Sequence, residues 1–118
     1  GGRALNPQAL LGQIEGGLVM GIGTALTEEY RLEEGIPQTR KWADYQVPLL
    51  KHTPQLEVKV LEHPVSTGPY GAKGIGELPS IPTAPAICNA IHAATGKRIY
   101  HLPVQSALLK VKQVKDEG

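Results

Sequence analysis

The sequence predicts a small α+β fold in which two to three helices pack on a small mixed or antiparallel sheet. Two segments carry apolar residues at helical spacing, and a third alternates apolar and polar residues. The 118 residues are enough for one domain over 1–118. Glycine (14) and proline (10) are frequent and phenylalanine is absent. We therefore expect a core of Leu, Ile, Val and Ala and a large share of loop.

The first predicted helix covers residues 11–30, where apolar residues recur at helical spacing. Its interior glycines are unusual, because each costs up to ~1 kcal/mol relative to alanine in helix propensity. Gly12 and Gly16 share one face, and Gly17 and Gly21 share another. Such faces allow a cofactor or another backbone to approach closely. Tight packing against a helix or sheet explains them equally well.

Before and after this helix, local signals mark a cap, a turn and a strand. Asn6-Pro7 is suited to cap or start the helix. Residues 31–42 are expected to be extended and broken by a turn at 34–37. Residues 56–62 alternate apolar and polar side chains, which predicts a half-buried strand.

The second predicted helix runs from about residue 82 to residue 95. Thr83 is a plausible N-cap, and Gly96 occupies the C′ position where glycine commonly ends a helix. Residues 97–101 are predicted to form a short strand. A last helix is expected to open at Pro103, with one apolar face made by Val104, Ala107, Leu108 and Val111.

Composition excludes several classes of function. The net charge is +1, with 12 basic and 11 acidic residues, and nothing indicates nucleic-acid binding. We expect no apolar run of membrane length and therefore predict no membrane partner. Cys88 is the only cysteine, which rules out an internal disulfide and fits a reducing, cytoplasmic location. The four histidines lack ligand spacing, so no metal held by protein ligands is expected.

The segment 68–77, GPYGAKGIGE, is the most informative part of the chain. Four glycines fall within nine residues, and the carboxylate of Glu77 follows directly. Glycine lets a backbone come close to a ligand, so the pattern suggests a cofactor with an acid or base beside it. A mobile surface loop is the alternative. The P-loop and dinucleotide-binding spacings both fail, so a nucleotide-binding module is disfavoured.

At the level of whole motifs, the chain resembles the xanthine dehydrogenase and aldehyde oxidase family, the molybdenum hydroxylases. The resemblance covers about residues 2–109, with the motifs in the family's order and spacing. They are GRALNP at 2–7, GQIEGG at 12–17, GIGTAL at 21–26, TGPYGAKGIGE at 67–77, IPTAPAICNAI at 81–91 and GKRIYHLP at 96–103.

This resemblance implies a fragment from the C-terminal part of a molybdopterin-binding domain. Glu77 matches the family's general base, and Gln13 matches a glutamine that hydrogen-bonds the pterin. Gly12 and Gly76 would lie against the cofactor, and Lys73 would balance phosphate or tune Glu77. The implied cofactor is molybdenum-molybdopterin, with or without an attached nucleotide. Its dithiolene holds the metal, so the chain needs no metal ligands of its own.

The resemblance also implies partners and a reaction class. The partners are the remainder of the molybdenum subunit and domains or subunits that carry iron–sulfur clusters and FAD. The substrate is a small molecule, either a purine, another N-heterocycle or an aldehyde, and water supplies the inserted oxygen. A non-catalytic assembly or interaction module that reuses the fold, with Glu77 idle, stays open as the alternative.

Overall fold

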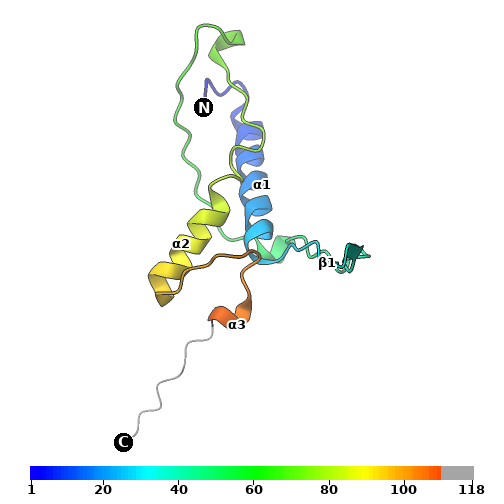
Figure 1. Ribbon diagram of the computed structural model, residues 1–118. Helices are drawn as coiled ribbons and strands as arrows, with labels where there is room; N and C mark the ends of the chain where they lie inside the picture. Colours follow the sequence, from blue (N-terminus) through cyan, green and yellow to red (C-terminus); the bar gives the residue numbers. More distant parts are fainter. Residues whose placement is uncertain (110–118) are drawn as a thin grey trace, which may run out of the picture.

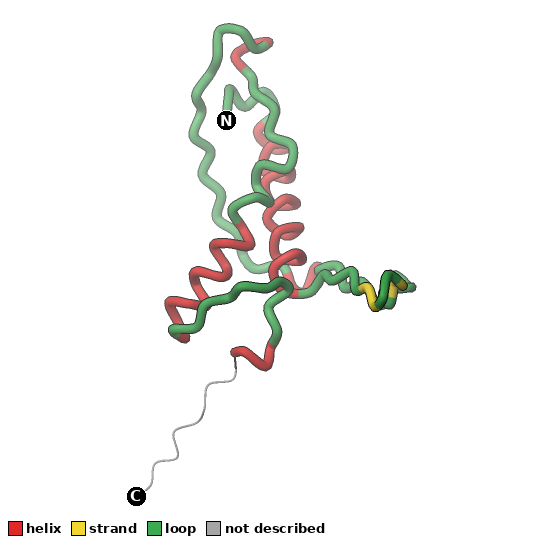
Figure 2. The backbone as a smooth tube through the Cα atoms, in the orientation of Figure 1, coloured by secondary structure: helices red, strands yellow, loops and turns green. Residues whose placement is uncertain are grey.

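The computed structural model describes residues 1–109. Two helices form its body, a short hairpin projects from one end of them, and a long loop runs back along the first helix (Figures 1 and 2). This arrangement confirms the predicted α+β class. The sheet is a single antiparallel pair, and it lies apart from the helices instead of beneath them. The elements in chain order are α1 (Pro7–Leu26), β1 (Leu32–Glu33), β2 (Ile36–Pro37), η1 (Leu50–His52), η2 (Pro69–Gly71), α2 (Thr83–Thr95) and α3 (Ser106–Leu109).

Helix α1 begins where the sequence places its capping signal. The Asn6 side chain accepts a hydrogen bond from the backbone N–H of Ala9 at 3.0 Å, and Pro7 opens the first turn. The helix therefore starts at Pro7 rather than at Leu11. It ends at Leu26, short of the predicted end at residue 30. The Thr27 hydroxyl donates to the backbone carbonyl of residue 46 at 2.6 Å, which ties the departing chain to another segment.

One glycine face of α1 is the contact surface for α2. A Cβ added to Gly21 would lie 2.4 Å from the Cβ of Thr83, and one added to Gly17 would lie 2.8 Å from the Cβ of Pro79. Both distances are too short for real side chains, so only glycine permits this approach. For this face, helix packing is the correct one of the two interpretations.

Helix α2 matches its predicted range. Its C-terminal end was predicted correctly, whereas its N-cap residue was not. Gly96 has φ 71° and ends the helix in the left-handed conformation, as predicted. Thr83 is not the N-cap, because Pro82 occupies that position. The buried Thr83 hydroxyl instead donates to the carbonyl of Pro79 at 3.0 Å. The turns that lead into α2 continue directly into the helix, so no side-chain cap is used.

The predicted strands are not found as paired strands, because a strand forms only where a neighbouring strand accepts and donates its backbone hydrogen bonds. Residues 56–62 are extended and show the expected alternation, with Leu56, Val58 and Val60 half-buried, but within residues 1–109 only Gly1 bonds to their backbone, at Leu61. Residues 97–101 join no ladder within the described part of the chain. The ladder that forms pairs Leu32 with Pro37 and Glu33 with Ile36, around the turn that was expected there.

The last predicted helix starts later than expected. Helix α3 covers Ser106–Leu109 and begins after Pro103 instead of at it, because Val104 is engaged elsewhere. The Val104 N–H donates to the carbonyl of Ala25 at 2.8 Å, which seats this segment on the end of α1. Val111 of the predicted apolar face lies outside the described residues.

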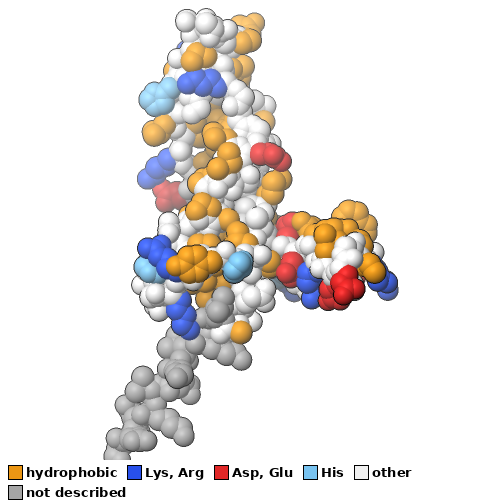
Figure 3. All heavy atoms as spheres, in the orientation of Figure 1, with side chains coloured by type: hydrophobic (Ala, Val, Ile, Leu, Met, Phe, Trp, Pro, Cys, Tyr) orange, Lys and Arg blue, Asp and Glu red, His pale blue; other side chains and the backbone are white. Residues whose placement is uncertain are grey.

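Little of the apolar surface is buried within residues 1–109. Ala25 and Val104 are the buried hydrophobic residues, and no large side chain is fully enclosed. Leu50 is 90% exposed and Trp42 is 89% exposed. Apolar side chains accordingly cover much of the face seen in Figure 3. Surface of this kind is typical of a segment that packs against further polypeptide.

By length and composition, α1 is also long and apolar enough to span a membrane, alone among the helices within residues 1–109. This corrects the expectation that no apolar run approaches membrane length, since glycine and alanine keep the helix apolar and Glu15 is its single charge. Buried helices of water-soluble proteins share these properties, so the support for a membrane location is weak. The absence of a membrane partner stays a prediction.

Candidate functional site

The glycine loop is held against the N-terminal segment by its backbone. The N–H of Arg3 donates to the carbonyl of Gly71 at 3.0 Å. A Cβ added to Gly2 would lie 2.5 Å from the nitrogen of Lys73, so only glycine fits at this crossing. The loop bends sharply there, because both Tyr70 (φ 53°) and Gly71 (φ 79°) adopt left-handed conformations. The N-terminal segment thus fixes the start of the loop.

A second tie joins the far end of the loop to α1. The side-chain amide of Gln13 donates to the backbone carbonyl of Gly76 at 2.5 Å. The two residues are far apart in sequence, and both were singled out as cofactor-binding candidates. Gln13 lies on the exposed side of α1, and its Oε1 has no protein partner within residues 1–109. The structure therefore brings these two candidates into direct contact and leaves an acceptor atom beside them.

Glu77 follows this contact and is exposed to solvent. Its backbone carbonyl accepts hydrogen bonds from the N–H of Ser80 at 3.0 Å and from the Ser80 hydroxyl at 2.8 Å. These bonds form a turn that fixes the Glu77 backbone. Its carboxylate has no hydrogen-bond or ionic partner in the described part of the chain. The side chain is positioned by its backbone and is chemically available.

Open glycines surround the contact between Gln13 and Gly76. A Cβ added at Gly12, Gly16 or Gly76 would meet nothing within 4 Å, in contrast to the packed glycines on the other face of α1. The same holds at Gly74. The second glycine face of α1 and the end of the loop therefore present bare backbone to whatever lies outside the chain.

This donor set fits a cofactor that brings its own metal ligands. It offers a neutral amide, open backbone and one carboxylate. No group of three or more His, Cys, Asp or Glu side chains suited to a metal lies within residues 1–109. An organic cofactor with polar edges, such as a pterin, matches an amide that can both donate and accept hydrogen bonds.

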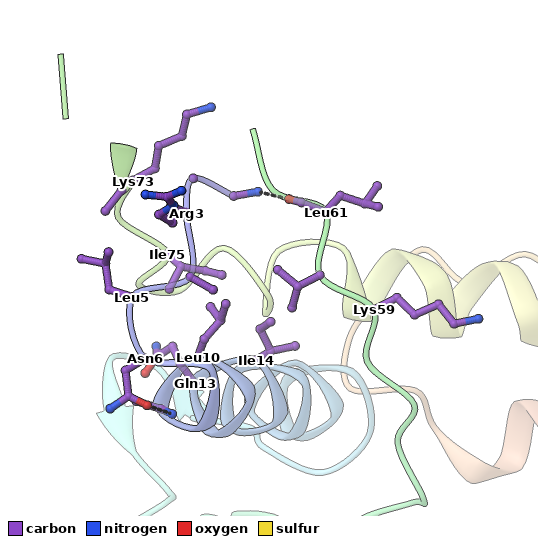
Figure 4. A pocket seen from close by; sticks show the side chains of 16 residues that line it. Arg3, Leu5, Asn6, Leu10, Gln13, Ile14, Lys59, Leu61, Lys73 and Ile75 are labelled. Carbon is purple, nitrogen blue, oxygen red and sulfur yellow. Dashed lines mark hydrogen bonds between the residues drawn. The ribbon is translucent and has the colours of Figure 1, made fainter. Parts of the chain in front are cut away.

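A cavity of about 390 Å³ lies next to this region, between the N-terminal segment, the start of α1 and residues 59–61. Gln13 and Lys73 border it, whereas Glu77 does not. Figure 4 shows the Lys73 side chain pointing away from the cavity. Lys73 forms no ion pair with Glu77 in the described structure. Its predicted role as a counter-charge stays a prediction.

Sequence reasoning missed the residues that support the loop. Gly2 and Arg3 act through close backbone approach and a backbone hydrogen bond, and neither leaves a chemical signature in the sequence. The available signal was the glycine at position 2, ahead of the Asn6-Pro7 start of the first helix. The link from Gln13 to Gly76 also escaped, because a side-chain bond across the fold has no local pattern.

Known proteins resemble this chain in sequence. Residues 1–54 match the family model of a molybdopterin cofactor-binding domain. The chain is 44% identical over 103 residues to an aldehyde oxidoreductase from Megalodesulfovibrio gigas. It is 42% identical over 105 residues to a putative xanthine dehydrogenase molybdenum-binding subunit from Escherichia coli K12. The chain belongs to the xanthine dehydrogenase and aldehyde oxidase family. These alignments take in 86% and 87% of this chain but 11% and 14% of the two relatives.

Two solved enzyme structures share the fold. Quinoline 2-oxidoreductase from Pseudomonas putida 86 matches with a TM-score of 0.80 and 32% identity, over 86% of this chain and 14% of that one. A Cu,Mo-CO dehydrogenase matches with a TM-score of 0.73 and 32% identity, over 80% of this chain and 12% of that one. The chain therefore corresponds to a short segment of a family member's molybdenum-binding subunit.

Proposed function

We propose that this chain contributes the general base and part of the pterin-binding surface of a larger molybdenum hydroxylase. The enzyme would oxidise a purine, another N-heterocycle or an aldehyde, with water as the oxygen source. One observation carries the proposal. Glu77, exposed and unpartnered, directly follows the Gly76 carbonyl that is bound by Gln13. A carboxylate, an amide and open backbone thus meet at one edge of the chain.

Glu77 acts as the proton acceptor in this proposal. Bound molybdenum would supply the redox chemistry and the acidification of water. A general base must reach within hydrogen-bond distance of the proton that it removes. Two observations support this role: Ser80 bonds to the Glu77 backbone carbonyl, and the Glu77 carboxylate has no partner within residues 1–109.

Gln13, Gly12 and Gly76 are proposed to face the cofactor. Gln13 donates one amide hydrogen to the Gly76 carbonyl, and its oxygen and second hydrogen can bind a pterin edge. Gly12 lies beside it on α1, and its missing side chain leaves room for close approach. Lys73 is proposed to lie near a phosphate of the cofactor, where its charge would help most.

Partners follow from the short span of the chain. It covers 11–14% of the relatives described above, so the remaining cofactor contacts must come from elsewhere. We propose that the chain packs against the rest of a molybdenum subunit in the cytoplasm. Iron–sulfur and FAD domains or subunits would carry electrons onward. The exposed apolar side chains supply the surface for the first of these contacts.

The same apolar surface supports the second candidate, a non-catalytic assembly module. The two candidates differ in one experiment. Turnover of purines and aldehydes is measured in the assembled enzyme that contains this chain, with and without the substitution Glu77→Gln. Loss of turnover with the cofactor retained supports the catalytic role. Unchanged turnover supports the assembly module and rejects the role of Glu77 as base.

A further inference from the structure

The extended segment 54–62 has the side chains of a strand without its pairing. Leu56, Val58 and Val60 are half-buried, while the residues between them are exposed. The backbone N–H groups of residues 55–60 and the C=O groups of residues 54–60 have no protein partner anywhere in the described chain. An edge of this kind is a template for another strand.

Two hydrogen bonds at the end of this segment show which strand fits. The N-terminal nitrogen of Gly1 donates to the carbonyl of Leu61 at 3.1 Å. The N–H of His63 donates to the carbonyl of Gly1 at 2.7 Å. One residue that bonds to the two neighbours of a residue opposite it is the pattern of a parallel ladder. Gly1 is thus paired with Glu62, and the two backbones run in the same direction.

We propose that the polypeptide leading into Gly1 in the longer subunit forms a strand parallel to residues 54–62. This inference rests on the proposed place of the chain within a larger molybdenum subunit. Parallel strands require a crossover connection, usually a helix. Helix α1 lies between Gly1 and this segment in the sequence and would serve as that crossover, which gives a β–α–β unit.

The register follows from the Gly1–Glu62 pair. The second residue before Gly1 lies opposite Val60, the third opposite Lys59 and the fourth opposite Val58. The second residue before Gly1 would donate to the carbonyl of Lys59 and accept from the N–H of Leu61. Both of these groups point to the same edge as the Leu61 carbonyl that Gly1 already uses.

The cavity beside Val60 matches the side chains of such a strand. It lies in the corner between the N-terminal segment and residues 59–61, and its apolar lining includes Leu10, Ile14 and Ile75 (Figure 4). Residues opposite Val58 and Val60 would place their side chains on the same face as these valines, toward α1. We therefore expect apolar residues at the second and fourth positions before Gly1.

A cysteine pair in the intact molybdenum subunit tests the register. Lys59→Cys is combined with a cysteine at the third position before Gly1, in a background with Cys88→Ser. Neighbouring strands lie about 4.8 Å apart, within the range that a disulfide can span. The matched control pairs the same upstream cysteine with Glu57→Cys. Glu57 is exposed like Lys59 and forms an ion pair with it at 3.2 Å, but it lies two residues out of register.

We expect a disulfide in the Lys59 variant and none in the Glu57 variant, as identified by mass spectrometry of the oxidised subunit. No disulfide in the Lys59 variant, or equal yields in both, overturns the proposal. Residue-level hydrogen exchange gives a second measurement. Slow exchange at the amides of residues 57, 59 and 61 is expected, and fast exchange there rejects a neighbouring strand on this edge.

The same preparations separate this inference from the proposed function. Molybdenum content and turnover are measured on the reduced parent subunit that carries Cys88→Ser. If the parent is active and the Lys59→Cys variant forms no disulfide, the proposed strand is rejected and the proposed function is unaffected. If the Lys59→Cys variant forms the disulfide but the subunit binds no molybdopterin, the proposed function is rejected and the proposed strand is supported.

Discussion

The side chain of Gln13 donates to the backbone carbonyl of Gly76 across 2.5 Å and joins the first helix to the glycine loop. Gly76 directly precedes Glu77, so this bond sets where the loop delivers its carboxylate. Gln13 therefore has two roles in our interpretation. It positions the base through the backbone of Gly76, and it offers its remaining amide atoms to the cofactor.

Glu77→Gln is expected to lower turnover of the assembled enzyme by about 10²–10⁴-fold, the usual contribution of a general base. Glutamine keeps the size of the side chain and removes its basicity, so molybdopterin content should be unchanged. Steady-state kinetics and metal analysis on the same sample check both statements. The matched control is Glu15→Gln, an exposed glutamate on α1, which should leave turnover unaltered.

Gln13→Glu is expected to release the loop and weaken cofactor binding. The new carboxylate cannot donate to the Gly76 carbonyl, so faster hydrogen exchange is expected over residues 74–78, together with a lower molybdopterin content. Gln8→Glu is the control, because Gln8 is exposed on the same helix and makes no hydrogen bond through its side chain. Equal effects from both substitutions would show that added charge, and not the lost bond, is responsible.

Alanine at the two glycine faces of α1 should give opposite results. Gly21→Ala forces a Cβ against Thr83, and overpacking of this kind typically costs about 1–3 kcal/mol. Gly12→Ala meets open space and gains up to about 1 kcal/mol in helix propensity. In the intact subunit, Gly21→Ala should lower the melting temperature. Gly12→Ala should keep or raise it but reduce cofactor content, and normal loading of this variant argues against a cofactor on that face.

Tyr45 makes a pH-dependent contact with Glu28, just after the end of α1. Its hydroxyl donates to Glu28 at 2.7 Å, and this hydrogen bond raises the pKa of Tyr45 above its usual value of 10.0. The bond needs the neutral phenol, so its stabilising effect is present below pH 10 and is lost as pH rises through the raised pKa. A difference absorbance titration between the wild type and Tyr45→Phe should give a midpoint above 10. Glu28→Gln should bring that midpoint down.

Local signals in the sequence predicted local structure well. The Asn6 cap and Gly96 at the end of α2 were both foreseen, because a capping side chain and a left-handed glycine act within one turn. Thr83 shows the limit of this reasoning. Its residue type suits an N-cap, but the incoming turns of 75–82 occupy that position, and its hydroxyl bonds to Pro79 instead.

By itself the sequence determined that helices α1 and α2 form, the turn of the hairpin, the alternation of residues 56–62 and the family to which the chain belongs. Each of these depends on residue type and on spacing along the chain. Only the tertiary structure decided which glycine face packs on α2, that Gln13 reaches Gly76, and that Gly1 pairs with Glu62 while the backbone of residues 54–60 stays unpaired within the described chain. These depend on contacts between residues distant in sequence, and the strand that we propose beside residues 54–62 lies outside the described residues.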